Sequence, residues 1–285
     1  MNKPVAFRPG NYYVSLSLTG YYCELLCPLC KGTFLKSMIS APTTQSLYNI
    51  VKSLYNKGAR GFLLSGGFNR EGYLMISKEH LKVVKKLKKD LEVVFSIHLG
   101  LAPRDLLEEV WSSGIDFIDF EVPPSDLYVK LAKNLPDHRV SDYVKFAEYA
   151  LTLDKNFLVP HLIIDSKLAT FNDEVNVLNQ LSTLNPRLLV LLVEIRKGPW
   201  NLSKNSFERV KNILAISKNL FREVSLGCMR NPKFKVYDDK FIELGLLDRI
   251  ANPRNGTIKK YGLRVIGACC SIERKHFKLF PILNK

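Results

Sequence analysis

Residues 14–30 read VSLSLTGYYCELLCPLC, and the interpretation of the whole chain starts from this stretch. Its first five residues alternate apolar and serine side chains, a pattern typical of a β-strand. Cys23, Cys27 and Cys30 then follow within eight residues. A loop this short can turn three thiolates toward one point, as the capping of one corner of an iron–sulfur cube requires. Three protein ligands leave a coordination position open, which favours chemistry over a purely structural site.

Simpler explanations of the three cysteines fit less well. A structural zinc site takes four nitrogen or sulfur ligands, often from paired Cys-x2-Cys knuckles, and neither a fourth cysteine nor a histidine lies nearby. A disulfide would use two of the cysteines and leave the third without a partner. Three inert buried thiols would not explain the tight clustering. We therefore predict an iron–sulfur cluster, with structural zinc as the alternative.

The pattern Cys23-x3-Cys27-x2-Cys30 after a first strand resembles the signature of the radical S-adenosylmethionine enzymes. The resemblance implies that the three cysteines hold a [4Fe-4S] cluster and that S-adenosylmethionine binds its fourth iron through the methionyl amine and carboxylate. It also implies that an electron from the cluster cleaves the sulfonium to give a 5′-deoxyadenosyl radical. Leu29 departs from the pattern, because many members place an aromatic residue there beside the adenine. An apolar contact is retained.

The length and composition of the chain describe one large α/β domain. The 285 residues are 46% hydrophobic, which is ample for a core and excludes general disorder. The longest strongly apolar run, residues 188–193, is far shorter than the ~18 residues that a membrane span needs. No signal-peptide pattern follows the N-terminus, so we expect a cytoplasmic protein without a membrane segment. Six cysteines in that compartment favour metal or redox chemistry over disulfides.

The charge balance indicates an anionic partner. A formal net charge of +15 suits a nucleic acid or an acidic protein. The count comprises 28 Lys and 14 Arg beside only two Gln, a balance that is also found in proteins from hot environments. Many of the lysines, as in residues 82–89, are spaced as on a solvated helix face, with a specific binding patch as the alternative. No RNA-binding fingerprint of basic and aromatic residues is present, so nucleic acid is the less favoured partner.

Apolar strand-like runs alternate with helix-like segments along most of the chain. We expect helices at residues 43–57, 77–90, 103–113, 142–153, 172–184 and 203–220, and strands at residues 14–18, 61–65, 92–98, 116–122, 157–164, 188–195, 223–227 and 247–251. This alternation predicts right-handed βαβ units and a parallel (β/α) barrel, partial or complete, with six to eight strands. Residues 1–230 form the predicted barrel core. Residues 231–285 form a predicted C-terminal extension over one barrel end, which would complete the barrel and carry ligands of a second cluster.

Candidate site residues follow successive strands at the ends where a barrel gathers its function. The positions are Cys23, Cys27 and Cys30 after the first predicted strand, Ser65, Gly66 and Gly67 after the second, His98 and Glu121 at the ends of the third and fourth, His161 within the fifth, residues 196–199 at the end of the sixth, and Cys228 after the seventh. Their agreement depends on strand order as well as on the cysteines, which supports the barrel.

The resemblance implies cofactor contacts for several of these residues. In radical S-adenosylmethionine enzymes a Gly-Gly-Glu stretch binds the methionyl amine. This chain has Gly66-Gly67-Phe68 at that position, so the resemblance implies only that backbone groups bind the amine. The alternative is an ordinary turn. Glu121 matches the position of a ribose-binding residue, or it is an exposed carboxylate at the start of a loop. His98 and His161 are either core histidines with satisfied hydrogen bonds or residues that line the pocket.

Cys228, Cys269 and Cys270 form a second cysteine set. One interpretation makes them ligands of an auxiliary iron–sulfur cluster above the barrel mouth. That arrangement needs a fourth ligand, and adjacent cysteines rarely bind one metal comfortably. The alternative is a set of buried thiols, which behave as small hydrophobic groups.

The layout resembles the biotin-synthase-like branch of these enzymes. Residues 14–23, residues 226–230 and the pair Cys269-Cys270 are similar to an archaeal family of biotin-synthase homologues, one member type of which is half of a two-protein lipoyl synthase. This implies sulfur insertion into an octanoyl chain, with an acidic lipoyl carrier protein, a second radical enzyme chain and an electron donor such as ferredoxin as partners. The alternatives are a radical tRNA-modifying enzyme that thiolates or methylates, and a metal-binding protein without turnover.

Overall fold

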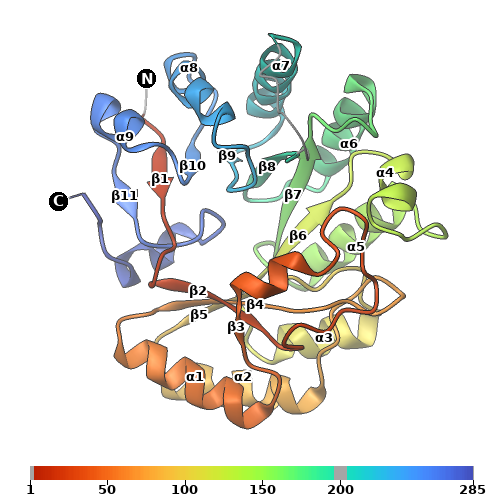
Figure 1. The fold of residues 1–285 in the computed structure, drawn as a ribbon, viewed down its shortest axis with the longest axis vertical. Coiled ribbons are helices and arrows are strands. Elements are labelled where there is room, and N and C mark those ends of the chain that lie inside the picture. The colour runs from red at the N-terminus through yellow and green to blue at the C-terminus, as the bar shows by residue number, and fades with distance from the viewer. Residues whose placement is uncertain (1–2, 196–203, 285) are drawn as a thin grey trace.

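The computed structural model describes residues 3–195 and 204–284, and it is built on one parallel sheet with helices on its outer side (Figure 1). The described residues form an 11-stranded sheet in the order β11-β1-β10-β9-β8-β7-β6-β5-β4-β2-β3. The strands are β1 (Val5–Phe7), β2 (Tyr13–Ser17), β3 (Ile39–Ser40), β4 (Gly61–Ser65), β5 (Val94–Ile97), β6 (Phe117–Val122), β7 (Leu158–Ile164), β8 (Leu189–Val193), β9 (Val224–Leu226), β10 (Arg249–Ala251) and β11 (Val265–Ile266). The sheet curls into an open barrel whose edge strands are β11 and β3.

The outer layer consists of helices between successive strands. They are α1 (Thr44–Asn56), α2 (Lys78–Asp90), α3 (Arg104–Ser112), α4 (Asp126–Leu131), α5 (Val140–Leu153), α6 (Phe171–Thr183), α7 (Lys204–Leu220), α8 (Asp238–Glu243) and α9 (Asn255–Tyr261), with short 3-10 helices at η1 (Thr33–Ser37), η2 (Phe234–Tyr237) and η3 (Arg274–Leu279). Thr43 caps α1 and Ser77 caps α2, each through a side-chain oxygen that accepts a backbone N–H. None of the described helices has the length and apolar character that a membrane span requires.

The predicted parallel (β/α) architecture is confirmed. Each of the eight predicted strands is present with its ends within two residues of the prediction. β1, β3 and β11 were not predicted, because runs of two or three residues carry no measurable periodicity. α5 begins two residues earlier than predicted, since the Asp142 carboxylate accepts the Arg139 backbone N–H and so caps the first turn. Residues 196–199 and the predicted start of the last helix at residue 203 lie outside the described residues.

The C-terminal segment and the N-terminus share one edge of the sheet. β1 pairs in parallel with β10 on one side and with β11 on the other, so the first strand lies between two of the last. Residues 231–285 thus contribute α8, β10, α9 and β11 to the sheet and its cover before the tail begins. In Figure 1 the red strand β1 stands among the blue C-terminal elements.

The two faces of the sheet carry different side chains. On the outer face, residues such as Leu16, Phe62 and Ile118 are fully buried against the helices. On the inner face, Phe117, Val159 and other apolar side chains pack on residues of the C-terminal tail. The inner face also carries polar side chains toward the carboxyl ends of the strands, and these build the candidate site.

Candidate functional site

The loop of three cysteines is held against the segment that follows β4. Because β2 and β4 are adjacent parallel strands, their C-terminal loops start side by side. The Phe68 carbonyl accepts the backbone N–H groups of Glu24 and Leu25, both at 3.0 Å, and it lies 3.8 Å from the Cys23 thiol. Leu25, only 4% exposed, anchors the loop in the core.

Gly67 lies closer to the cysteine loop than any side chain would allow. A Cβ at this position would stand 1.9 Å from the Tyr22 carbonyl oxygen and 2.5 Å from the Cys23 Cα. Thr19 joins the two segments, since its hydroxyl accepts the Gly67 N–H at 2.6 Å and donates to the Tyr22 carbonyl at 2.8 Å. Glycine is therefore required where the two loops touch.

The donor set fits a [4Fe-4S] cluster with three protein ligands. All three cysteines are free thiols and partly exposed, on a loop where Leu26 and Lys31 adopt positive φ values of 42° and 48°. A hydrogen bond from the Cys27 thiol lowers the pKa of Cys30 and raises the pKa of Cys27, so one thiolate is favoured before any metal binds.

Among residues 3–195 and 204–284, no three His, Cys, Asp or Glu side chains converge as ligands of a single ion. A cubane binds each thiolate through a different iron, so its ligands occupy separate corners rather than one point. Binding would therefore require the hydrogen-bonded Cys27 and Cys30 thiols to separate, a local change within a short loop.

Glu121 forms an ion pair at the mouth of the barrel. The Lys133 ammonium lies 2.5 Å from Glu121 Oε1, with 17% of the lysine side chain and 37% of the glutamate side chain exposed. Burial by itself lowers the pKa of Lys133, and the Glu121 carboxylate with its neighbours reverses this to a net rise. Sequence reasoning placed Glu121 here but missed Lys133, which lies in a loop without periodicity.

Ser65 and His98 face each other across β4 and β5. The Ser65 hydroxyl lies 3.3 Å from His98 Nδ1. Burial lowers the pKa of His98, so the imidazole is neutral near pH 7. Both residues belong to the mouth of the barrel beside the Gly66–Gly67 turn.

The tail after β11 enters the barrel interior, where it meets His161. His161 Nδ1 lies 2.9 Å from the Val159 carbonyl and Nε2 lies 3.2 Å from the Ser271 hydroxyl. Since a carbonyl can only accept, Nδ1 carries a proton and donates to Val159, while Nε2 is left to pair with the Ser271 hydroxyl. The predicted extension thus fills part of the interior in addition to covering an end of the barrel.

Two arginines, Arg249 buried and Arg187 half-buried, hold this tail segment by its backbone. Arg249 Nη1 donates to the carbonyls of Cys270 and Ile272 at 2.8 Å and 2.6 Å. Arg187 donates to the Ser271 carbonyl between them. Three successive carbonyls are therefore bound by guanidinium groups, and this explains how a segment without regular structure is held inside the barrel.

The second cysteine set is partly brought together. A hydrogen bond between the Cys269 and Cys270 thiols lowers the pKa of Cys270 and raises that of Cys269. Cys228 follows β9, and the residue as a whole is exposed. Burial of its thiol nevertheless raises the pKa of Cys228 to about 11, and the nearby Cys270 thiol raises it further. The pair and Cys228 therefore lie within electrostatic reach of one another.

Asp119 is a site residue that the sequence indicated only indirectly. It lies on the same face of β6 as Phe117 and Glu121, and it is 4% exposed. Its Oδ1 has no hydrogen-bond partner among the described residues and lies 3.5 Å from His161 Nε2. The signal available in the sequence was the period-2 spacing of two carboxylates in an otherwise apolar strand.

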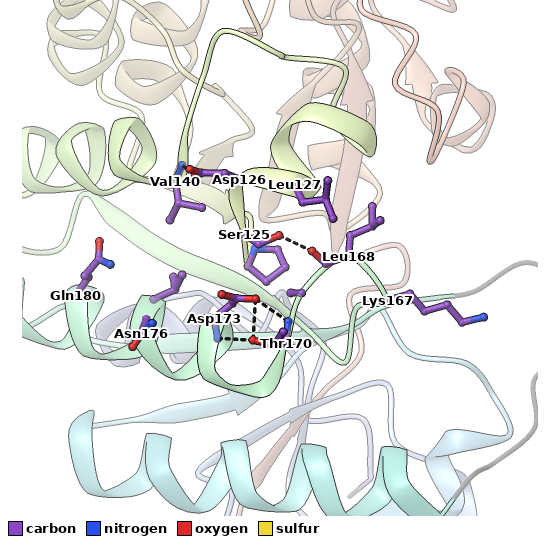
Figure 2. A pocket seen from close by; sticks show the side chains of 13 residues that line it. Ser125, Asp126, Leu127, Val140, Lys167, Leu168, Thr170, Asp173, Asn176 and Gln180 are labelled. Atoms are coloured by element: carbon purple, nitrogen blue, oxygen red, sulfur yellow. Dashed lines mark hydrogen bonds between the residues drawn. The ribbon is translucent and has the colours of Figure 1, made fainter.

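A separate cavity of about 500 Å³ lies on the outer side of the barrel and contains none of these residues (Figure 2). The segment after β6, the loop after β7 and helix α6 line it. Its polar groups bond to one another: the Ser125 hydroxyl donates to the Leu168 carbonyl at 2.5 Å, and Asp173 caps α6 together with Thr170. The chemistry of the molecule is therefore concentrated at the barrel mouth.

Comparisons with known proteins place the fold. Neither a model of a protein family nor a curated protein sequence matches the chain. Several solved structures do match the chain. Methylornithine synthase matches with a TM-score of 0.57 and 14% identity over 85% of this chain and 72% of that chain. HydG, a maturase of the [FeFe]-hydrogenase, from Carboxydothermus hydrogenoformans has a TM-score of 0.61 and 11% identity over 96% of this chain and 70% of that chain.

A lyase shares the same architecture. The hydroxymethylglutaryl-CoA lyase from Brucella melitensis matches with a TM-score of 0.53 and 11% identity over 89% of this chain and 81% of that chain. Methylornithine synthase and HydG are radical S-adenosylmethionine enzymes. At these identities the likeness establishes the fold, and the fold hosts more than one chemistry. The reaction must therefore be argued from the site.

Proposed function

We propose that this protein is a radical S-adenosylmethionine enzyme in which Cys23, Cys27 and Cys30 hold a [4Fe-4S] cluster. When bound, the cluster and S-adenosylmethionine supply a 5′-deoxyadenosyl radical that abstracts hydrogen from unactivated carbon. The fold shared with two radical enzymes supports this proposal, as does the resemblance of the cysteine spacing to their signature.

One observation carries the proposal: the cysteine loop and the Gly66–Gly67 turn are fastened together at adjacent strand ends. Gly67 fits against Tyr22 and Cys23 with no room for a side chain. A loop that only served as a connection would not need such contact. The turn would present backbone groups to the methionyl end of the cofactor, beside the iron that the cysteines leave free.

The remaining mouth residues are suited to bind and orient. Glu121, fixed by Lys133, would bind ribose hydroxyls, and His98, neutral and held by Ser65, would line the adenosyl side. His161 would help to hold the tail inside the barrel through its contact with Ser271. The protein's own contribution is positioning and exclusion of water, while the cofactor carries the radical step.

Anaerobic reconstitution of wild type and Cys27→Ala tests the proposal. Wild type should bind about four irons in this site, show the cluster's visible absorbance and release 5′-deoxyadenosine from S-adenosylmethionine under reduction. Cys27→Ala should lose all three, while Cys228→Ala should keep the cleavage. Full iron and full cleavage in Cys27→Ala would refute the assignment.

For the reaction itself, we propose sulfur insertion with an auxiliary cluster bound by Cys228, Cys269 and Cys270. The pairing of the Cys269 and Cys270 thiols and the electrostatic interaction of Cys270 with Cys228 support this. A lipoyl synthase-like reaction would insert sulfur into an octanoyl chain on an acidic carrier, for which the net charge of +15 is suited.

Iron and sulfide analysis of a Cys228→Ala, Cys269→Ala, Cys270→Ala triple variant tests the second cluster. Wild type should hold about twice the iron of the variant if both clusters exist. Equal iron in the two proteins would refute the auxiliary cluster and with it the main support for sulfur insertion, and the three thiols would then be structural.

We also propose that protein partners dock on the cysteine loop. Tyr21, Tyr22, Leu26 and Phe34 are each more than half exposed on this loop, which is unusual for large apolar side chains so close together. An electron donor such as ferredoxin, or a second radical enzyme chain, would cover them. Replacing Tyr21 and Phe34 by serine should slow reduction by a ferredoxin while leaving reduction by dithionite unchanged; equal slowing with both reductants would contradict docking.

A further inference from the structure

We infer that Asp119 is the anchor for a substrate that carries a primary ammonium group. The inference rests on the proposed function in one respect, namely that the ligand of the barrel interior is the substrate of the radical reaction. It starts from the unpaired Oδ1 of a carboxylate that is 4% exposed. A buried polar atom without a partner costs about 1–3 kcal/mol, so folds retain one mainly where a ligand satisfies it.

The neighbouring side chains cannot satisfy Asp119 themselves. His161 Nε2 is 3.5 Å from Asp119 Oδ1 and forms no hydrogen bond to it, and the same nitrogen lies closer, at 3.2 Å, to the Ser271 hydroxyl. On the other side, His98 interacts with Ser65. The Asp119 oxygen therefore faces the interior as an open acceptor.

The residues around Asp119 are less deeply buried than the carboxylate itself. His98, His161 and Cys269 are each partly exposed, although they surround a carboxylate that is almost completely buried. The Ser225 hydroxyl, on the inner face of β9, lies within hydrogen-bonding range of the Cys270 thiol, whose pKa it lowers. A ligand that reached this depth would therefore meet polar side chains rather than an apolar floor, with Asp119 Oδ1 as the open acceptor.

The hydrogen-bonding groups of the interior favour a ligand that donates to Asp119. The described arginines near the site are engaged: Arg249 and Arg187 bind the tail carbonyls, and Arg230 binds Asp238 together with the Gly227 and Ala251 carbonyls. Lys133 is paired with Glu121. No described cation is left to receive an anionic ligand group, whereas the Asp119 carboxylate is open. An ammonium group, with three donors and a positive charge, satisfies it.

Calorimetric titration with butylammonium chloride and sodium butyrate tests the inference on reconstituted wild type, Asp119→Asn and Asp137→Asn. Asp119→Asn keeps the shape and removes the charge, and Asp137→Asn is a control that removes an exposed carboxylate from the loop after α4. Butylammonium should bind wild type and Asp137→Asn alike, and should bind Asp119→Asn about tenfold or more weakly, since hydrogen bonds to charged groups are the strong ones. Butyrate should bind none of them.

Four results would overturn the inference. Equal binding of butylammonium to wild type and Asp119→Asn, absence of binding to wild type, or a preference for butyrate would each remove Asp119 as the anchor. Loss of butylammonium binding when S-adenosylmethionine is present would assign Asp119 to the cofactor instead of the substrate. Cleavage of S-adenosylmethionine is measured separately, so a protein that binds butylammonium through Asp119 but never cleaves the cofactor would refute the proposed function alone.

Discussion

Replacement of Gly67 by alanine tests the contact on which the candidate site depends. The added Cβ would stand 1.9 Å from the Tyr22 carbonyl oxygen and 2.5 Å from the Cys23 Cα. Both are backbone atoms, so neither can rotate away as a side chain would. To reach an ordinary contact of 3.4 Å, the cysteine loop must move away from the turn by about 1.5 Å.

The expected cost follows from the bonds that such a movement breaks. Inserting one carbon into a packed region costs about 1–3 kcal/mol when side chains can adjust. Here the Thr19 bridge and the two N–H bonds to the Phe68 carbonyl lie in the path of the movement. We expect the upper end, about 3 kcal/mol, which for a chain of this size lowers the melting temperature by about 5–10 °C.

The assay compares three glycines by thermal unfolding and by iron bound after reconstitution. Gly66→Ala meets the Leu74 and Thr19 side chains at 3.0–3.2 Å, where a shift of a few tenths of an ångström relieves the contact, so a smaller loss of about 1 kcal/mol is expected. Gly256→Ala meets nothing within 4 Å in the first turn of α9 and should be neutral or stabilising. Gly67→Ala alone should lose iron. A Gly67→Ala protein with wild-type stability and iron content would refute the reasoning.

Three further predictions follow from other contacts. Thr19→Val keeps the shape of Thr19 but removes both hydrogen bonds of the bridge, so the free energy of unfolding measured in urea should fall by about 1–3 kcal/mol. The control Thr33→Val, at the exposed end of the loop, should lower the free energy of unfolding by less. Equal losses in the two variants would contradict a bridge at Thr19. Arg230 and Asp238 form an ion pair whose two side chains are fully buried, so Asp238→Ala leaves the Arg230 charge without its carboxylate and should lower the free energy of unfolding by about 3–5 kcal/mol. The double variant Arg230→Met, Asp238→Leu removes both charges and should lose less stability. A double variant as unstable as Asp238→Ala would show that packing, not the charge, dominates. Burial lowers the pKa of His98, so below the usual histidine pKa of about 6.5 the unfolded chain binds a proton that the folded protein does not, and stability falls as the pH decreases from about 7 to 5. His98→Gln should flatten that part of the pH profile, and an unchanged slope in urea denaturation would show that other groups cause it.

The strands and the cysteine loop could be predicted because their signals are local. A run such as residues 61–65, apolar and ended by two glycines, indicates a buried strand and a turn without reference to any distant residue. The spacing of Cys23, Cys27 and Cys30 likewise lies within a single loop. β1 could not be predicted, because its three residues gain their stability from pairing with β10 and β11, more than 240 residues later in the chain.

The interior of the barrel was the least predictable part of the site for the same reason. His161 meets Ser271, Arg187 meets the carbonyl of Ser271, and Arg249 meets that of Cys270, all across long sequence separations. Nothing in a tail that reads GACCSIERKHF indicates that its backbone would be bound by two arginines. Lys133 was missed because it lies in a short loop, although it pairs with a residue that the sequence did identify.

The character of this interior bears on the substrate. An octanoyl chain prefers an apolar channel, because burying an unpaired polar group against hydrocarbon costs free energy. Below the mouth, however, the Asp119 carboxylate leaves one oxygen without a hydrogen-bond partner among the described residues. A substrate with a cationic hydrogen-bond donor would pair with Asp119 and remove the free-energy cost of the unpaired carboxylate oxygen, whereas an octanoyl chain would not. The two hypotheses therefore predict opposite effects of one substitution. Asp119→Asn should weaken the binding of an ammonium substrate, whereas it should leave the binding of an octanoyl substrate unchanged or improve it.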